Sequence, residues 1–457
     1  MKKLKAVKTG LMWFSIFDFN EKHLNYIRDN YTYPHPIEED NTFCTFYETD
    51  EFIGIPYGDT EKLKRVIHHP FEIEDRSIAP TFTELGHSKM DLRDYQQSAK
   101  VEIFEIFRSG VHSFNLSGNP GSGKSFMLAN LLQELKVKAL VIAHLSMLIT
   151  QISDEIETAT GLKVTKLDAK NKELGDINVA TSQFVSRHPD LWKRIKHEIG
   201  CIVVDEAESS ASVTTLRILQ RSYAKYRIFI SATFSRNVDK RTEALRDLSG
   251  HKEVKLVRKD LLIPNIIMVK CPEYFYNKPS NPKLVKIEQG KFLTNTESIV
   301  DKVIKITQAS LQKNRQVLIA VDVLKLQDKL AYKLNDLGIK SVAVSSNVPM
   351  KQRPKILEDF EKGDVKVLLG FGTLNAGISL PHISTIIRLS TPSSLEKLEQ
   401  LIGRSVRDFK GKSGAYIVDL VFGGLYYNNR LQFYKRKQKA NQYKLFVTDW
   451  TKFEQKL

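Results

Sequence analysis

The chain has 457 residues, enough for two or three domains, and its 42% hydrophobic and 27% charged residues are typical of a globular protein. Its 69 lysines and arginines exceed its 53 aspartates and glutamates, and the resulting formal charge of +16 favours a polyanionic partner over a merely solubilising basic surface. The widely spaced Cys44, Cys201 and Cys271 indicate neither a disulfide framework nor a zinc site.

Residues 1–88 are rich in aromatic side chains and turn signals but lack a regular alternation. We expect a small β-containing accessory domain, in which the aromatics form the core or stack on bases. The apolar run from Leu11 to Phe17 stops at Asp18 without a small-residue cleavage site, and no apolar stretch reaches 18 residues. These features predict a cytoplasmic protein without membrane contact.

Residues 89–260 alternate short β-branched runs with amphipathic stretches. The runs SFNLS, KALVIAHL, INVATS, CIVVDEAE and RIFISAT each end in polar or small residues. This alternation predicts an α/β domain with a parallel sheet, whose active edge collects the carboxyl ends of the strands.

The string GNPGSGKS is a complete phosphate-binding loop between an apolar run and the helical segment FMLANLLQEL. Its glycines let backbone N–H groups and a helix N-terminus point at the phosphates of ATP. Lys124 adds a positive charge there, and the Ser125 hydroxyl suits Mg²⁺. Upstream, Gln96 offers the donor and acceptor needed to read adenine. We expect the nucleotide to contact Gln96 and the loop residues Gly118, Asn119, Pro120, Gly121, Ser122, Gly123, Lys124 and Ser125.

An acidic pair follows a later strand-like run, in VVDEAE. Asp205 is placed to hold Mg²⁺ through water, and Glu206 to orient or deprotonate the attacking water. Such a pair alone is commonly a helix N-cap, but the phosphate loop upstream makes it a Walker B arrangement. The small residues Ser231, Ala232 and Thr233 end another run and suit the transmission of the γ-phosphate state to a neighbouring surface.

A second alternating series falls within residues 261–457, in the runs RQVLIAVDV, KSVAVSS, VKVLLGFG, TIIRLS and GAYIVDL. It predicts a second α/β domain in tandem with the first, with Gly338 at a helix C-cap. We interpret residues 236–300 as a linker followed by an excursion of the second domain. The tail FYKRKQKANQYKLF suits duplex or junction contact, or a solvated amphipathic helix.

The string QLIGRSVR places Gln400, Arg404 and Arg407 at spacings of four and three, so all three share one helical face. Arginines there can reach across a cleft and stabilise charge on the γ-phosphate in the transition state. A solvated basic face is the alternative for the arginines taken alone.

In this order the strings resemble the motifs of superfamily 2 helicases over roughly residues 91–422. The resemblance implies two RecA-like domains that bind ATP and Mg²⁺ between them and nucleic acid across their tops. It adds Gly377 of GFGTLNAGIS to the nucleotide site, and Arg404 and Arg407 become arginine-finger candidates. The catalytic residues that it implies are Lys124, Asp205, Glu206, Gln400, Arg404 and Arg407.

The same resemblance implies nucleic-acid contacts at His144, Thr181, Ser182 and Thr373. Hydroxyls suit a translocase because they grip the sugar-phosphate chain without reading bases. His144 departs from the family, which usually has proline at its position.

The string with the acidic pair reads DEAE, and GFGTLNAGIS contains AGIS. The AGIS form is similar to that of the phage UvsW-like branch-migration helicases. We therefore expect a phage-encoded, ATP-dependent DNA helicase that remodels forks, Holliday-type junctions and displacement loops in the host cytoplasm. The alternatives are a duplex-translocating motor subunit of a restriction or repair complex without strand separation, and an RNA helicase.

Overall fold

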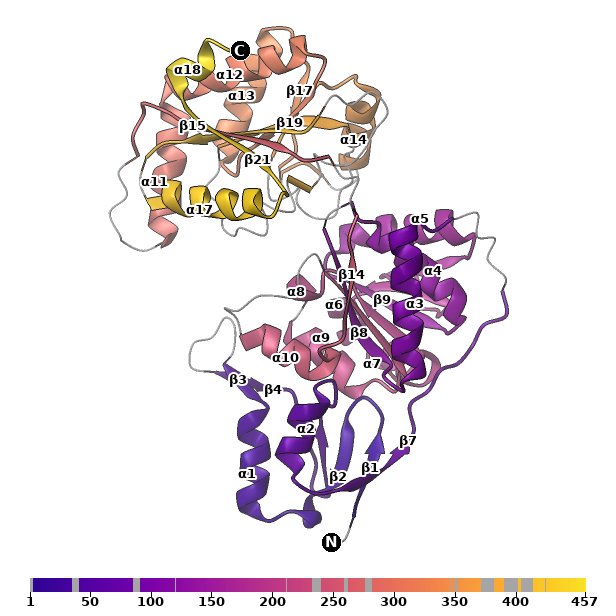
Figure 1. Cartoon of the computed structure of the whole chain (residues 1–457). Coiled ribbons are helices and arrows are strands. Elements are labelled where there is room, and N and C mark those ends of the chain that lie inside the picture. Colours follow the sequence, from indigo (N-terminus) through magenta and orange to yellow (C-terminus); the bar gives the residue numbers. More distant parts are fainter. Residues whose placement is uncertain are drawn as a thin grey trace. The chain divides into compact units, whose positions relative to one another are not determined.

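The computed structural model of the chain describes residues 3–34, 41–84, 91–119, 121–210, 212–231, 240–258, 262–275, 282–345, 347–349, 352–370, 382–389, 402–403, 414–423 and 425–457. Its contacts divide into two compact units, Met1–Arg258 and Lys259–Leu457. The first unit holds a small mixed sheet and a parallel sheet, and the second holds another parallel sheet (Figure 1). The expected α/β class, with two parallel-sheet domains and a small N-terminal sheet domain, is confirmed.

The N-terminal domain is a five-stranded sheet of order β5-β6-β2-β1-β7, with α1 and α2 sharing one apolar cluster with it. Asn20 and Asp59 cap the two helices by accepting backbone N–H bonds. A separate ribbon pairs β3 with β4. The elements are β1 (Leu4–Lys8), β2 (Met12–Ser15), the 3-10 helix η1 (Ile16–Asp18), α1 (Glu21–Asn30), β3 (Thr32–Pro34), β4 (Thr42–Cys44), β5 (Tyr47–Glu48), β6 (Phe52–Ile55), α2 (Thr60–Ile67) and β7 (Phe71–Asp75).

Most of the aromatic side chains in this domain are buried in a core or pack against one. This agrees with the first of the two alternatives from the sequence, core packing rather than base stacking. Phe14, Tyr31, Tyr33 and Phe43 are buried, whereas Phe17 is 80% exposed. Tyr33 and Phe43 belong to the core of the neighbouring parallel-sheet domain, so the β3-β4 ribbon is shared between the two.

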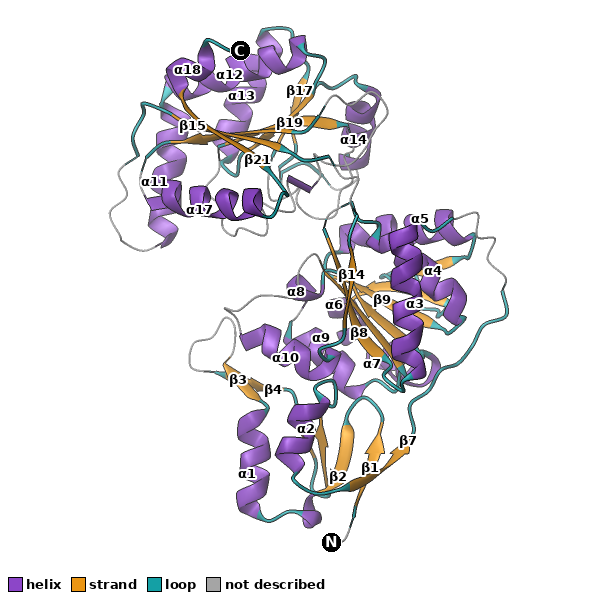
Figure 2. Ribbon diagram, viewed as in Figure 1, coloured by secondary structure: helices purple, strands orange, loops and turns teal. Residues whose placement is uncertain are grey.

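The parallel sheet of the first unit has the order β10-β11-β9-β12-β13-β8-β14. Figure 2 shows the strands of this sheet among the helices of the unit. Helices α3, α4 and α5 contribute to the core cluster on one face, and α6, α7, α9 and α10 to the cluster on the other. The elements are α3 (Asp94–Arg108), β8 (Ser113–Gly118), α4 (Lys124–Leu135), β9 (Ala139–Ala143), α5 (Ser146–Thr160), β10 (Val164–Lys166), β11 (Ile177–Thr181), α6 (Ser182–Ser186), α7 (Pro189–Glu198), β12 (Cys201–Val204), α8 (Ala207–Ser210), α9 (Val213–Arg221), β13 (Tyr226–Ser231), α10 (Lys240–Ser249) and β14 (Glu253–Leu256).

The second unit has a parallel sheet of order β17-β18-β16-β19-β20-β15-β21. Helices α14 and α17 pack in the cluster on one face, and α11, α12, α13 and α18 in the cluster on the other. The elements are β15 (Asn265–Lys270), α11 (Pro282–Asn295), α12 (Glu297–Gln312), β16 (Gln316–Ala320), α13 (Leu324–Asp336), β17 (Ser341–Ala343), α14 (Arg353–Lys362), β18 (Val367–Leu369), β19 (Ile383–Arg388), β20 (Tyr416–Val421), α17 (Leu425–Lys439), β21 (Lys444–Asp449) and α18 (Trp450–Glu454).

The interpretation of residues 236–300 as linker and excursion is wrong for β15. This strand pairs with β20 on one side and β21 on the other, so it is an inner strand of the sheet. Its apolar residues Ile266 and Met268 are fully buried, as an inner parallel strand requires. Lysines and prolines on both sides obscured this short run in the sequence.

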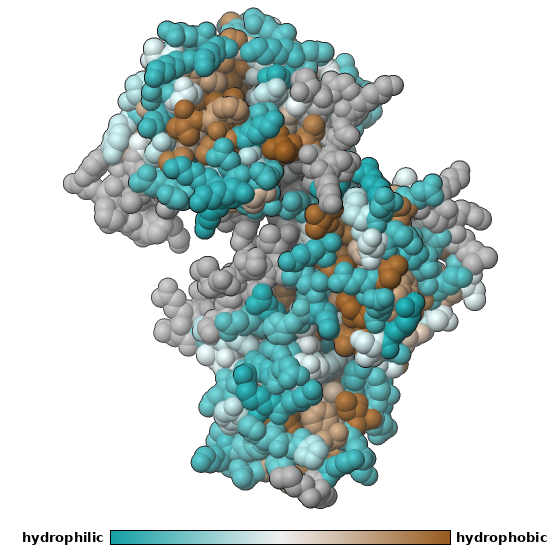
Figure 3. Space-filling view, in the orientation of Figure 1, coloured by the Kyte–Doolittle hydropathy of each residue, from teal (hydrophilic) through white to brown (hydrophobic). Residues whose placement is uncertain are grey.

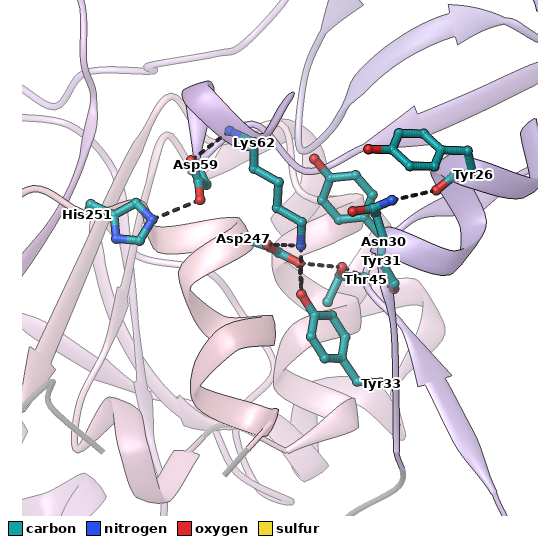
Figure 4. Close-up of polar contacts among 9 residues, drawn as sticks. All are labelled: Tyr26, Asn30, Tyr31, Tyr33, Thr45, Asp59, Lys62, Asp247 and His251. Atoms are coloured by element: carbon teal, nitrogen blue, oxygen red, sulfur yellow. Dashed lines mark hydrogen bonds and ion pairs between the residues drawn. The ribbon is translucent and has the colours of Figure 1, made fainter. Parts of the chain in front are cut away.

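A buried polar cluster joins the N-terminal domain to α10 (Figure 4). Asp247 on α10 is 3% exposed and accepts hydrogen bonds from the Tyr33 hydroxyl at 2.5 Å and the Thr45 hydroxyl at 3.0 Å. The Lys62 ammonium forms an ion pair with the same carboxylate at 2.8 Å. Burial raises the pKa of Asp247, and Lys62 opposes that rise. Charged and neutral donors from three N-terminal segments therefore converge on one carboxylate.

Backbone contacts complete this junction. The Arg227 guanidinium on β13 is buried, and its Nη2 donates to the Gly10 carbonyl at 2.8 Å. A Cβ atom at Gly10 would lie 2.3 Å from the Gln220 carbonyl oxygen, and one at Gly58 would lie 2.6 Å from the Gly250 nitrogen. The two backbones approach so closely that only glycine fits at these positions.

Candidate active site

The predicted phosphate loop connects β8 to α4. Gly121 and Gly123 have φ of +83° and +80°, the left-handed region that favours glycine. A Cβ atom at Gly123 would also lie 2.6 Å from Gln96 Nε2. The loop therefore turns tightly into the helix N-terminus, the geometry that presents N–H groups to a phosphate.

The side chains of this loop suit a triphosphate with Mg²⁺. Lys124 Nζ donates to the Gly118 carbonyl at 2.5 Å and lies 3.4 Å from the Asn119 carbonyl oxygen. Ser122 Oγ is buried and, among the described residues, has no hydrogen-bond partner. Ser125 is exposed in the first turn of α4. A lysine ammonium, an unpartnered hydroxyl and an exposed hydroxyl thus surround the place that phosphates would take.

Gln96 lies against this loop, as its predicted role requires. Its Oε1 accepts from the Arg93 backbone N–H at 3.1 Å, and its Nε2 lies 3.4 Å from the Gly123 carbonyl oxygen. Its neighbour Tyr95 donates to the Ser122 carbonyl at 3.0 Å. Gln96 therefore braces the start of α3 and the loop, and contact with adenine stays a prediction.

Asp205 and Glu206 directly follow β12. The Asp205 N–H donates to the Ile142 carbonyl at 3.0 Å, which extends the ladder to β9 by one bond. Burial raises the pKa of Asp205 to about 7, the charge of Glu206 adds to the rise, and Lys124 opposes it. Glu206 has φ of +46°, a conformation that is strained for a residue with a side chain. The acidic pair and the loop lysine thus share one electrostatic site.

The strand order brings five of the predicted positions to one edge of the sheet. Because all seven strands are parallel, their carboxyl ends meet there. In sheet order, Thr181 ends β11, His144 follows β9, Asp205 follows β12, Ser231 ends β13 and Gly118 ends β8. Ser231 therefore lies between the acidic pair and the phosphate loop, where a coupling residue is expected.

His144 lies close enough to the acidic pair for the charge of Glu206 to influence the pKa of its imidazole. Burial lowers the pKa of its imidazole, and the charge of Glu206 opposes that shift. Its Nδ1 is buried and has no hydrogen-bond partner within the part of the chain that the structure describes. Contact with nucleic acid stays a prediction for this residue.

Thr181 and Ser182 begin α6. The Thr181 hydroxyl accepts the Phe184 backbone N–H at 3.2 Å and so caps this helix. Ser182 is 4% exposed. Both hydroxyls serve the local fold here, and their grip on a sugar-phosphate chain stays a prediction.

The remaining predicted positions lie outside the described residues. They are Pro120, Ala232, Thr233, Thr373, Gly377, Gln400, Arg404 and Arg407.

Sequence reasoning missed two residues at the loop. Tyr95 donates to the Ser122 carbonyl and is adjacent to Gln96 in the sequence, so its position was a usable signal. Arg258 Nη1 donates to the Gly121 carbonyl at 3.2 Å, and its separation of 137 residues leaves no local signal.

Within the described ranges, no helix is long and apolar enough to cross a membrane. The same residues contain no group of three or more His, Cys, Asp or Glu side chains placed to hold a metal ion. A Mg²⁺ ion would therefore need phosphate oxygens and water in addition to Asp205 and Ser125, as Mg²⁺ commonly does.

Two family models match the chain. Residues 89–236 match the model described as type III restriction enzyme, res subunit, and residues 298–408 match the helicase conserved C-terminal domain. The first match contains the phosphate loop and the acidic pair, and the second contains the QLIGRSVR string.

Curated relatives include helicases from a phage and from yeast. A probable helicase D10 of Escherichia phage T5 is 24% identical over 428 residues, covering 92% of this chain and 91% of the relative. A putative ATP-dependent helicase IRC3 of Saccharomyces cerevisiae is 25% identical, covering 72% of this chain and 51% of the relative.

Solved structures match at low identity. The S. cerevisiae Dbp5 structure bound to RNA and ADP BeF3 has a TM-score of 0.56 and 16% identity, covering 80% of this chain and 96% of that chain, which shows a shared fold. The structure of T4 UvsW aligns with 98% of this chain at 15% identity, with a TM-score of 0.38. The family models and relatives support an ATP-dependent helicase.

Proposed function

We propose that this chain, which resembles the superfamily 2 helicases, is an ATP-dependent DNA helicase that remodels branched DNA. The observation that carries the proposal is the meeting of the phosphate loop and the Asp205–Glu206 pair at one edge of a parallel sheet. The electrostatic interaction between Lys124 and Asp205 supports a common role for the phosphate loop and the acidic pair.

The residues divide the work of hydrolysis between them. The loop and Lys124 would bind the triphosphate, while Ser125 and Asp205 would hold Mg²⁺, which neutralises charge on the phosphates when bound. Glu206 would orient the attacking water and accept its proton. Arg404 and Arg407 would stabilise the transition-state charge from the second domain.

Several observations favour DNA and a branched substrate. The charge of +16 favours a polyanion, and the strings AGIS and QLIGRSVR resemble the UvsW-like branch-migration helicases. The relative from phage T5 aligns with 92% of this chain, which supports a phage enzyme acting in the host cytoplasm. Thr181, Ser182, His144 and Thr373 are the residues that would contact the strand.

The match to a restriction-enzyme subunit favours a second candidate, a motor that translocates on duplex without separating strands. One comparison tests both candidates. ATP turnover and strand separation are measured on forked, four-way-junction, single-stranded and linear duplex DNA, with RNA of the same sequences as control. Stimulation and unwinding greatest on forks and junctions would support the proposal. Stimulated turnover without strand separation would support the translocating motor, and a preference for RNA would exclude both.

A further inference from the structure

The net positive charge of the chain is concentrated in the second unit. Residues 1–258 contain 36 lysines and arginines against 35 aspartates and glutamates, whereas residues 259–457 contain 33 against 18. Formal charges of +1 and +15 follow. The second unit therefore attracts a polyanion more strongly than the first.

The last turns of α17 carry the densest run of this charge. Lys435, Arg436 and Lys439 are exposed, and Lys444 is exposed just after the helix. Within the described part of the chain, no ion pair is recorded for these four side chains, whereas Glu297 holds both Lys329 and Lys333 of α13.

The helix dipole explains only part of this arrangement. Cations near a helix C-terminus gain a few tenths of a kcal/mol to about 1 kcal/mol each, and the effect fades within one turn. It does not account for Lys444, which is exposed five residues beyond the end of the helix. The surplus charge therefore favours an external anionic partner.

The opposite face of α17 is fixed to the sheet by a buried ionic cluster. Asp419 on β20 is fully buried and accepts from Arg430 Nη1 at 2.8 Å and from the Tyr434 hydroxyl at 2.8 Å. Arg388 at the end of β19 donates to the same carboxylate at 3.2 Å. Phe433 adds apolar packing in the same core. The basic side chains consequently project from a helix that is held in place.

We propose that the outward face of α17, formed by Lys435, Arg436 and Lys439, binds the sugar-phosphate backbone of duplex DNA. The proposal rests on the proposed function for its partner, nucleic acid. In the space-filling view the surface at the place of α17 is hydrophilic (Figure 3). Phosphate contacts of this kind position a duplex without reading its sequence.

A duplex fits this face better than a single strand. Surfaces that bind single strands combine positive charge with aromatic side chains on which bases stack. The aromatic residues of this part of α17, Phe433 and Tyr434, are buried. The exposed Phe446 follows Leu445, which packs in the core on the α17 side, so Phe446 points to the other face of the sheet.

The test compares two triple variants of the full chain with the same charge change. Lys435→Glu, Arg436→Glu and Lys439→Glu are combined on α17. The control combines Lys291→Glu, Lys325→Glu and Lys340→Glu, which are exposed positions on and beside the helices of the opposite layer. Affinity for a labelled linear duplex is measured without nucleotide by fluorescence anisotropy over a salt series. A neutral triple variant with glutamine at the α17 positions repeats the measurement, and thermal melting checks that each protein is folded.

We expect the α17 variant to bind duplex at least about 10-fold more weakly than the control variant. The slope of log K against log salt should fall by about 2 to 3, since each lost phosphate contact removes about 0.9. The glutamine variant should show a smaller loss in the same direction. Equal losses in the α17 and control variants, or an unchanged salt slope in a folded α17 variant, would overturn the proposal.

ATP turnover without nucleic acid separates this proposal from the proposed function. It should be equal in the wild type and the α17 variant, because α17 supplies none of the predicted nucleotide contacts. If the wild type hydrolyses no ATP but the α17 variant loses duplex binding, the helicase assignment fails and the binding face stands. If the wild type unwinds DNA and the α17 variant binds duplex normally, only the binding face fails.

Discussion

The two parallel sheets have the same topology but opposite chemistry. When the seven strands of each parallel sheet are numbered in chain order, both sheets follow the spatial order 3-4-2-5-6-1-7. In the first unit, the first strand leads into the glycine loop and the fifth leads into Asp205 and Glu206. In the second unit, the first strand leads into CPEYF, and the fifth ends in Arg388, whose guanidinium is fully buried. The shared fold supplies an edge, and among the described residues the glycine loop and the acidic pair lie at this edge in the first unit.

The difference in charge agrees with this division. The first unit is nearly neutral, whereas the second carries almost all the surplus of cations. Within the first unit, residues 1–88 contain 10 basic and 15 acidic residues, which argues against a phosphate grip by the N-terminal domain. The phosphate loop with its acidic pair and the surplus of positive charge thus lie on different units.

Replacing Lys124 gives the largest expected effect and tests whether this division is real. In Lys124→Ala, ATP turnover should fall by about 1000-fold or more, because the triphosphate loses its cationic partner. Duplex affinity should stay within about 2-fold of the wild type, because the second unit carries the charge. Steady-state ATPase and anisotropy measure the two properties, with exposed Lys163→Ala as control. Undiminished turnover would remove the loop from the active site.

Arg407→Ala asks whether the second unit completes the site of the first. Turnover should fall by about 100-fold or more while ATP affinity changes little, because an arginine finger acts on the transition state. Single-turnover hydrolysis and nucleotide titration separate the two quantities. Normal hydrolysis in this variant would leave all catalysis on the first unit.

The buried carboxylates of Asp419 and Asp247 allow the stability of the second unit to be compared with that of the N-terminal junction in the first unit. Asp419→Ala should destabilise the second unit by about 3–5 kcal/mol, because Arg388 and Arg430 would remain buried without their anion. Asp247→Ala should loosen the N-terminal junction by a smaller amount, because only Lys62 loses its charged partner. Hydrogen exchange read by mass spectrometry locates each effect. Loss of protection in the wrong unit, or in neither, would contradict this account.

The smallest expected effect is the release of a fraction of a proton from Asp205 when Mg²⁺ and nucleotide bind. Its folded pKa of about 7 lies above the unfolded value, so this group favours the folded state fully below about pH 4 and progressively less as pH rises toward 7. Binding of Mg²⁺ and nucleotide requires the ionised form and should release about half a proton at pH 7 and almost none at pH 9. Calorimetry in buffers of different ionisation enthalpy measures it, and Asp205→Asn should abolish it. Equal release at both pH values would assign the proton to another group.

Local patterns predicted the parts of the fold that depend on neighbours in sequence. The runs before Gly118, Asp205 and Ser231 form β8, β12 and β13, and Gly338 has the φ of +74° expected just after α13. The strands β10 and β14 escaped prediction because they have only three and four residues. The strand β21 escaped prediction because polar side chains at both ends leave only three apolar residues between them.

The contacts that escaped prediction join residues far apart in sequence. Asp247 bonds to Tyr33 across 214 residues, and Arg258 reaches Gly121 across 137. The sequence around an arginine or an aspartate does not indicate which distant residue it will contact, because that contact depends on how the whole unit packs. The loop and acidic pair were predictable because their chemistry fixes their residue types.

The backbone of Glu206 has a consequence for how this chain could be engineered. Its left-handed conformation costs about 1–2 kcal/mol relative to glycine, which visits this region freely. A library screened only for thermal resistance should therefore enrich Glu206→Gly, a protein that melts later and has lost its proposed base. Folding alone would favour a different residue here, and the glutamate at this strained position agrees with its proposed role as the catalytic base.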